Sequence, residues 1–207
     1  FGRVHPSHRN YEQWFQMEEK EKQLHREDMA EVFIATAEKY EHSAIFIHSN
    51  PGVPPETRKM IDLIREKTGD HYFLMKHGDV TFGIPSDSKE LTEFCLDMRR
   101  DPQKLKQEAQ RRVDDVLAKA EKHYMGSGLD CMALCTDYCF NTGPFISPGQ
   151  FSEFVAPYLE KLTRGYRDMG FYVIKHTDGN IMPILDQLLQ THPHALHSLD
   201  PQGGVDM

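Results

Sequence analysis

The sequence predicts an α/β fold whose strands run parallel to one another. Short apolar runs that end in polar residues alternate with segments long enough to be crossover helices, and no turn sequence typical of hairpins separates the runs. A strand, a crossover helix and another strand, repeated about four times, give either a doubly wound sheet or a barrel.

Residues 1–42 are predicted to form an N-terminal helical segment. Apolar residues between Met29 and Tyr40 recur at helical spacings, whereas the charged residues before them predict a break or an exposed stretch around residues 18–28. The mixed charges of that stretch are expected to coat a solvated face. The strand and helix units over residues 43–207 follow, and we predict that they form a single domain.

The strands are identified as short runs rich in Ile, Phe, Tyr, Val or Leu, a composition typical of buried parallel strands. Residues 80–84 could form a further strand or an extended loop. The predicted strands are Ser43–His48, His71–His77, Leu129–Thr136, Phe171–His176 and Ala195–Leu199.

Helices are predicted between these strands from apolar periodicity and from capping residues at their first positions. Pro157 is expected to kink the fourth of them, whereas Pro183 is tolerated because the N–H groups of a first turn lack intrahelical partners. The predicted helices cover residues 55–67, 87–98, 101–126, 147–166 and 180–190.

The number of predicted strands favours an incomplete barrel. Gly-x-Gly-x-x-Gly and P-loop motifs are absent, which removes the usual nucleotide-binding reasons to prefer an open sheet. Five strands in 207 residues fall short of the eight strands and roughly 250 residues of a (β/α)8 barrel. A chain that covers only part of a barrel would account for both shortfalls.

Composition excludes several classes of protein. A formal net charge of −8 argues against a surface that binds nucleic acid, and 39% hydrophobic residues are too many for a disordered chain. The absence of any apolar run of about 18 residues argues against a membrane span. The four cysteines show no pattern of a disulfide framework, so we expect reduced thiols and a cytoplasmic protein.

Candidate functional residues follow the predicted strands, because the site of a parallel α/β fold gathers at the carboxyl ends of its strands. The alternative is that polar residues end strands simply because strands end at the surface. The residues selected by this rule are His48, His77, Asp137, His176, Asp178, His197 and Asp200.

Two of these residues, His176 and Asp178, stand one residue apart at a strand end, so both side chains can face one point. A neutral imidazole and a carboxylate are half of a ligand set for zinc or a harder divalent metal. Alternatively, Asp178 caps the following helix and His176 hydrogen-bonds to it. Asp137 could act as an acid or base, accept protons from substrate N–H groups, hold a cationic cofactor, or cap its own loop.

Longer motifs around these residues resemble the uroporphyrinogen decarboxylase superfamily, which includes the decarboxylase of tetrapyrrole synthesis and corrinoid-dependent methyltransferases. The resemblance is close over residues 129–207, and it rests on Asp137, Asn141–Pro148, Phe151, Phe154, Pro157-Tyr158, Val173–Ile181 and His197–Pro201. It implies a parallel (β/α)8 TIM barrel with a cleft at the carboxyl ends of the strands, whose missing strands we expect outside this segment.

The resemblance is nearer to the methyltransferase branch. Decarboxylases of the superfamily carry an N-terminal loop of the form Met-Arg-Gln-Ala-Gly-Arg, which pairs with the substrate carboxylates, and this chain has no such loop. The methyltransferases carry His-x-Cys-Gly where this chain has His176, Asp178 and Gly179. The carboxylate in place of the thiolate fits a substrate such as an ether or amine, whose leaving group must be protonated or positioned.

The resemblance therefore implies an enzyme that moves a methyl group between a small methylated substrate and a corrinoid protein. It implies zinc or another divalent metal, and a corrinoid cofactor carried by the partner protein. The alternatives are a uroporphyrinogen decarboxylase without a cofactor and a non-catalytic tetrapyrrole or small-molecule binding module. The expected catalytic residues are Asp137 and Asp178, the metal ligands His176 and Asp178, and the substrate contacts His48, His77, Tyr138, Asn180, His197 and Asp200.

Overall fold

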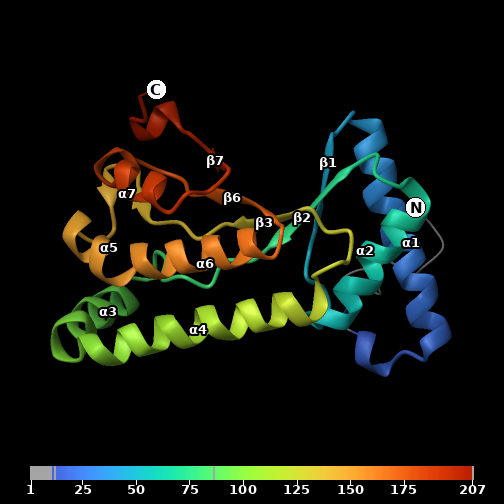
Figure 1. Cartoon of the computed structure of the whole chain (residues 1–207), viewed down its shortest axis with the longest axis horizontal. Coiled ribbons are helices and arrows are strands. Elements are labelled where there is room, and N and C mark those ends of the chain that lie inside the picture. The colour runs from blue at the N-terminus through green and yellow to red at the C-terminus, as the bar shows by residue number, and fades with distance from the viewer. Residues whose placement is uncertain (1–10, 12, 86, 207) are drawn as a thin grey trace. The chain divides into compact units, whose positions relative to one another are not determined.

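The computed structural model describes residues 11, 13–85 and 87–206, and it has the α/β architecture with parallel strands that the sequence predicts (Figure 1). The chain divides into two compact units. Unit 1 is the chain up to His77 together with residues 122–131, and unit 2 is residues 78–121 and 132–207.

Unit 1 is a pair of parallel strands covered by two helices. Strand β1 (Ala44–Ile47) pairs with strand β2 (Phe73–His77), with Ala44 opposite Phe73. Alternate residues of both strands are buried, and helix α2 (Pro54–Thr68) is buried along its apolar side. Helix α1 (Glu19–Lys39) packs against α2 and β1, after the short 3-10 helix η2 (Trp14–Gln16).

Of the two alternatives expected around residues 18–28, the break does not occur, because α1 runs without interruption from Glu19, whereas residues 18–24 lie mostly exposed. A capping box between Glu18 and Glu21 satisfies its first turn. The charges are also less solvated than expected: Arg26 is 3% exposed, and its guanidinium bonds to Glu19 at 2.5 Å and to Glu56 at 2.8 Å. Ion pairing lets a charged residue lie on the buried side of the helix.

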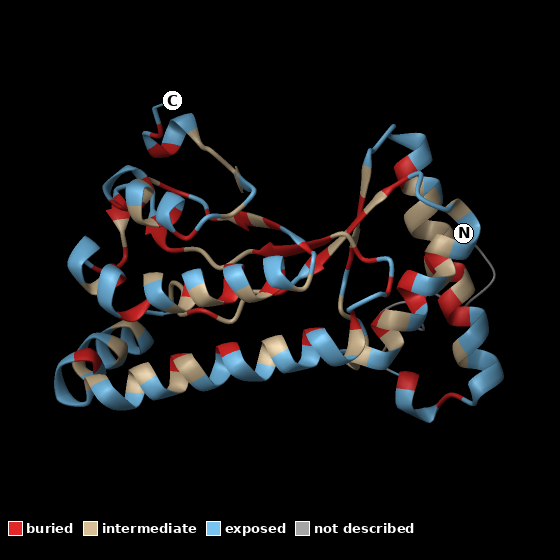
Figure 2. Cartoon of the chain, in the orientation of Figure 1, coloured by how far each residue is buried: buried red, intermediate tan, exposed pale blue. Residues whose placement is uncertain are grey.

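Three further parallel strands lie in unit 2, apart from Cys131 at the start of the first. They are β3 (Cys131–Leu134), β6 (Tyr172–His176) and β7 (Ala195–His197), with β6 between the other two. Helix α6 (Ala156–Asp168) packs against β6, and α4 (Pro102–His123) approaches α6 at Gly165. Figure 2 shows that burial follows the strands and one side of each long helix. The remaining elements are α3 (Ser88–Arg100), α5 (Pro148–Phe154), α7 (Leu185–Gln190), and the 3-10 helices η3 (Met182–Ile184) and η4 (Pro201–Gly203).

The five predicted strands are confirmed, two in unit 1 and three in unit 2, which is fewer than the eight of a closed barrel. Residues 80–84 form an extended loop. In place of the kink predicted at Pro157, the helix breaks fully at Val155 and gives α5 and α6. The helix predicted over residues 180–190 begins as the 3-10 helix η3. None of the described helices has both the length and the apolar content needed to cross a membrane.

One hairpin lies outside the runs that the sequence identifies as strands. Strand β4 (Cys139–Phe140) pairs antiparallel with strand β5 (Gly143–Pro144) across a two-residue turn. Two residues are too few to show the alternation that identifies a strand in a sequence. The hairpin follows Asp137 directly, so it shapes the loop at the end of β3.

Candidate functional site

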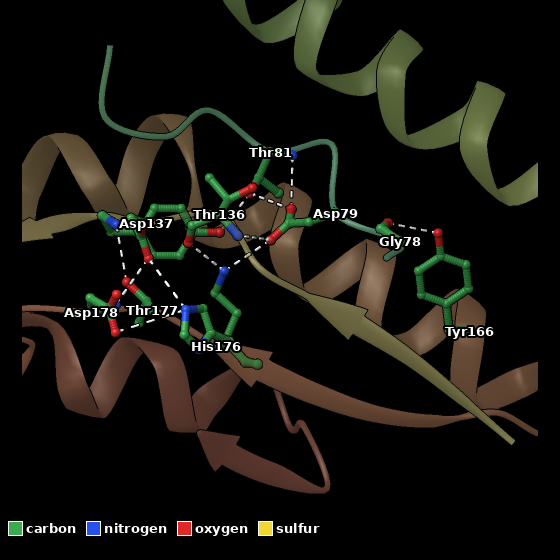
Figure 3. Close-up of polar contacts among 11 residues, drawn as sticks. Gly78, Asp79, Thr81, Thr136, Asp137, Tyr166, His176, Thr177 and Asp178 are labelled. Atoms are coloured by element: carbon green, nitrogen blue, oxygen red, sulfur yellow. Dashed lines mark hydrogen bonds and ion pairs between the residues drawn. The ribbon is translucent and has the colours of Figure 1, made fainter. Parts of the chain in front are cut away.

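Three side chains of unit 2 converge where β3 and β6 end. The His176 Nε2 atom lies 3.9 Å from Asp137 Oδ1 and 3.8 Å from Asp178 Oδ1. Figure 3 shows the three side chains turned toward one another, and one ligand atom from each lies within 4.8 Å of the other two. The sequence predicts His176, Asp137 and Asp200 on one rim of the sheet; the structure brings Asp137 and His176 together, whereas Asp200 follows β7 and caps η4.

The loop after β6 is held against the β4–β5 hairpin by close backbone packing. Gly179 has a φ of +82°, and a Cβ atom built on it would lie 2.7 Å from the carbonyl oxygens of Cys139 and Phe140. The N–H of Asn180 donates to the Phe140 carbonyl at 3.0 Å. The N–H of Asp178 donates to Asp137 Oδ1 at 3.0 Å, so the hairpin loop and the loop after β6 form one rigid edge.

The second ring nitrogen of His176 is also occupied. His176 and His197 stand opposite each other in the parallel pairing of β6 and β7, and their Nδ1 atoms lie 2.9 Å apart. One of the two nitrogens must donate and the other accept. When His176 carries its proton on Nδ1, its Nε2 lone pair faces Asp137 and Asp178.

Asp178 is not the residue that caps the following helix. The Asn180 Oδ1 atom accepts the N–H of Met182 at 3.2 Å at the start of η3. The Asp178 carboxylate accepts a hydrogen bond from the Ser198 hydroxyl, and its side chain is 59% exposed. The carboxylate therefore remains open to a ligand.

The other predicted substrate contacts lie in different surroundings. Asp200 caps η4 by accepting the N–H of Gln202 at 2.8 Å. The Tyr138 side chain is fully buried behind the site, and burial raises the pKa of its phenol well above the ordinary value. His48 and His77 belong to unit 1, where their ring centroids lie 6.2 Å apart. The roles of Asp200, Tyr138, His48 and His77 as substrate contacts remain predictions.

The donor set of the site suits a divalent cation. Two carboxylates and one imidazole offer oxygen and nitrogen ligands, and two negative charges balance an M²⁺ ion. The nearby cysteines remain protonated thiols and offer no thiolate ligand, because burial raises the pKa of both Cys135 and Cys139. The pKa of Cys139 is raised to about 12 by burial and by the Asp137 charge. The residues present therefore fit a metal that accepts oxygen ligands.

Sequence reasoning missed the buried pair Asp79–Lys175 and the hydroxyl of Ser198. Asp79 stands two residues after β2, so the rule that selected the other strand-end residues applied to it as well. Lys175 precedes His176 inside a strand, where a charged residue is not expected to be buried.

The chain matches the model of a known protein family. The family model of uroporphyrinogen decarboxylase (URO-D) matches residues 84–204. No curated protein and no solved structure gives a significant match. The matched range contains Asp137, His176 and Asp178.

Proposed function

The chain belongs to the uroporphyrinogen decarboxylase family, and we propose that it acts as a methyltransferase that moves a methyl group between a small methylated compound and a corrinoid protein. The observation that carries the proposal is the convergence of Asp137, His176 and Asp178 on one point. A cluster of this composition could hold the ion of a metal-assisted reaction, whereas the decarboxylase alternative calls for no metal.

The residues that would hold the metal are Asp137, His176 through Nε2, and Asp178. When bound, a divalent cation would supply Lewis acidity toward the heteroatom that carries the methyl group. His197 would fix the orientation of His176 by accepting a hydrogen bond from its Nδ1–H, in the way that neighbours of metal-bound histidines commonly do.

The two carboxylates differ in what holds them, and this suggests different roles. Asp137 accepts the N–H of Asp178 and lies beside buried residues, so its position is fixed. Asp178 is more exposed and is held by the Ser198 hydroxyl. We assign to the Asp178 oxygen that does not ligate the metal the contact with the leaving heteroatom of an ether or amine substrate, which would take its proton from solvent as the methyl group leaves.

A methyl-transfer assay tests the proposal. The full chain, supplied with Zn²⁺ or Mn²⁺ and cobalamin in its Co(I) state, is expected to convert the absorption spectrum to that of methylcobalamin when methyl ethers or methylamines are added. His176→Ala should abolish this conversion, because it removes the one nitrogen ligand of the cluster. Uroporphyrinogen is expected to release no carbon dioxide.

Two results would contradict the proposal in different ways. Carbon dioxide release from uroporphyrinogen without added metal, lost in Asp137→Ala, would identify a decarboxylase. Binding of cobalamin or uroporphyrinogen without turnover of any substrate would identify a non-catalytic binding module.

A further inference from the structure

A buried ion pair lies directly behind the candidate metal site. The Lys175 Nζ atom lies 2.9 Å from Asp79 Oδ2, and the two side chains are 0% and 5% exposed. Figure 3 shows the Asp79 carboxylate beside Thr81 and Thr136, apart from Asp178. Burying two charges costs desolvation free energy that their attraction often does not offset, so the presence of the pair here suggests a functional role.

The pair binds both backbone polar groups of the residue before Asp137. Asp79 Oδ2 accepts the N–H of Thr136 at 3.1 Å, and Lys175 Nζ donates to the Thr136 carbonyl at 2.7 Å. The Thr136 carbonyl belongs to the peptide bond that leads into Asp137. Holding this peptide bond in place fixes the position of the Asp137 Cα atom, from which the side chain extends toward the site.

Lys175 also determines which way the His176 side chain points, because the two residues are neighbours in strand β6. Successive residues of a strand point to opposite faces, so burying Lys175 and Thr177 turns His176 toward the site. Thr177 Oγ1 accepts the N–H of Tyr138 at 3.0 Å, and the Lys175 ammonium lies 4.1 Å from the Tyr138 ring centroid. The residues that flank His176 thus bind the residues that flank Asp137.

Asp79 is itself held in one orientation. Its Oδ1 atom accepts the N–H of Thr81 at 3.0 Å and the Thr81 hydroxyl at 2.7 Å. That hydroxyl also lies 2.6 Å from the Tyr138 hydroxyl. Burial acts to raise the pKa of Asp79, but Lys175 and Thr81 outweigh it and hold the pKa below its ordinary value, so the carboxylate stays charged.

We propose that Asp79 and Lys175 are positioning residues that hold Asp137 and His176 at the separation that one metal ion requires. The proposal rests on the proposed function, because it assigns the pair a purpose in the metal site. Removing either charge should release the Thr136 peptide and weaken metal binding about 10–100-fold, the range typical of residues that orient metal ligands.

A cobalt titration tests the proposal on the full chain, since bound Co²⁺ reports its ligand geometry in its visible spectrum. Asp79→Asn and the milder, shape-conserving Thr81→Val are expected to weaken Co²⁺ binding and to alter the spectrum. Two controls should leave both unchanged: Lys161→Met, in an exposed ion pair with Asp114, and Ile61→Ala, which destabilises the core of unit 1, whereas the pair belongs to unit 2. Equal weakening in Ile61→Ala would overturn the proposal.

A second readout needs no metal. In the metal-free protein, Asp79→Asn is expected to shift and broaden the NMR signals of the His176 ring, although Asp79 does not touch that ring. Unchanged His176 signals would overturn the positioning role even if wild type binds Co²⁺. Changed signals in a protein that binds no Co²⁺ would support the positioning role and contradict the proposed metal site instead.

Discussion

Gly179→Ala is expected to destabilise the protein by at least about 3 kcal/mol. The residue needs a φ of +82°, and its added Cβ atom would lie 2.7 Å from two backbone carbonyl oxygens of the β4–β5 hairpin. A left-handed conformation alone costs an alanine about 1–2 kcal/mol. The remaining loss of stability arises from the steric clash with the two carbonyl oxygens, because backbone atoms cannot shift as easily as the end of a flexible side chain.

Two other glycines separate these contributions in urea unfolding at 25 °C. Gly126→Ala should show the cost of positive φ alone, since its φ is +68° and no atom lies within 4 Å of the added Cβ. Gly149→Ala, with neither constraint, should be neutral or slightly stabilising. A Gly179→Ala variant no less stable than Gly126→Ala would mean that the loop can leave the hairpin without loss.

Lys175→Met is expected to destabilise the protein by about 3–5 kcal/mol, because it leaves the Asp79 carboxylate buried without its counterion. The matched variant Lys161→Met removes an exposed ion pair and should cost under about 1 kcal/mol. Equal costs for the two substitutions would contradict the burial and the pairing of Asp79.

The pH dependence of stability follows from the same carboxylate. The folded-state pKa of Asp79 lies below its unfolded value of about 3.9, so its contribution is fully present above that pH and is lost as the pH falls through the folded pKa. Unfolding of Asp79→Asn should therefore depend less on pH than unfolding of wild type below about pH 4. A parallel pH dependence would contradict the assigned direction.

Local sequence patterns predicted the strands and the strand-end residues because both depend on short runs of residues. The apolar run before His176 identifies β6, and the polar residues after it identify the rim. The sequence left open a break or an exposed stretch at residues 18–28, and it could not show that Arg26 is buried there, because the partner Glu56 lies thirty residues away in the sequence. Charge patterning along one helix cannot reveal such a partner.

Two parts of the site depend on which strands are neighbours, which no local pattern contains. The contact between His176 and His197 requires the register of β6 against β7. The pair of Asp79 and Lys175 joins residues separated by 96 positions in the chain. The sequence could supply the ligands of the site, whereas the structure was needed to find what holds them in place.

The most direct test of the central claim is the metal content of the full chain after equilibrium dialysis against Zn²⁺ or Mn²⁺. We predict one bound ion per chain in wild type and in Asp168→Ala, and its loss in Asp137→Ala, His176→Ala and Asp178→Ala. Asp178→Ala should change the free energy of unfolding by no more than about 0.5 kcal/mol, since the N–H of Met182 at the start of η3 is bound by Asn180 and not by Asp178. Two results would contradict the account. One is a wild-type protein that binds no metal. The other is an Asp178→Ala variant that keeps its metal but loses about 0.5–2 kcal/mol of stability, the cost of a lost helix cap.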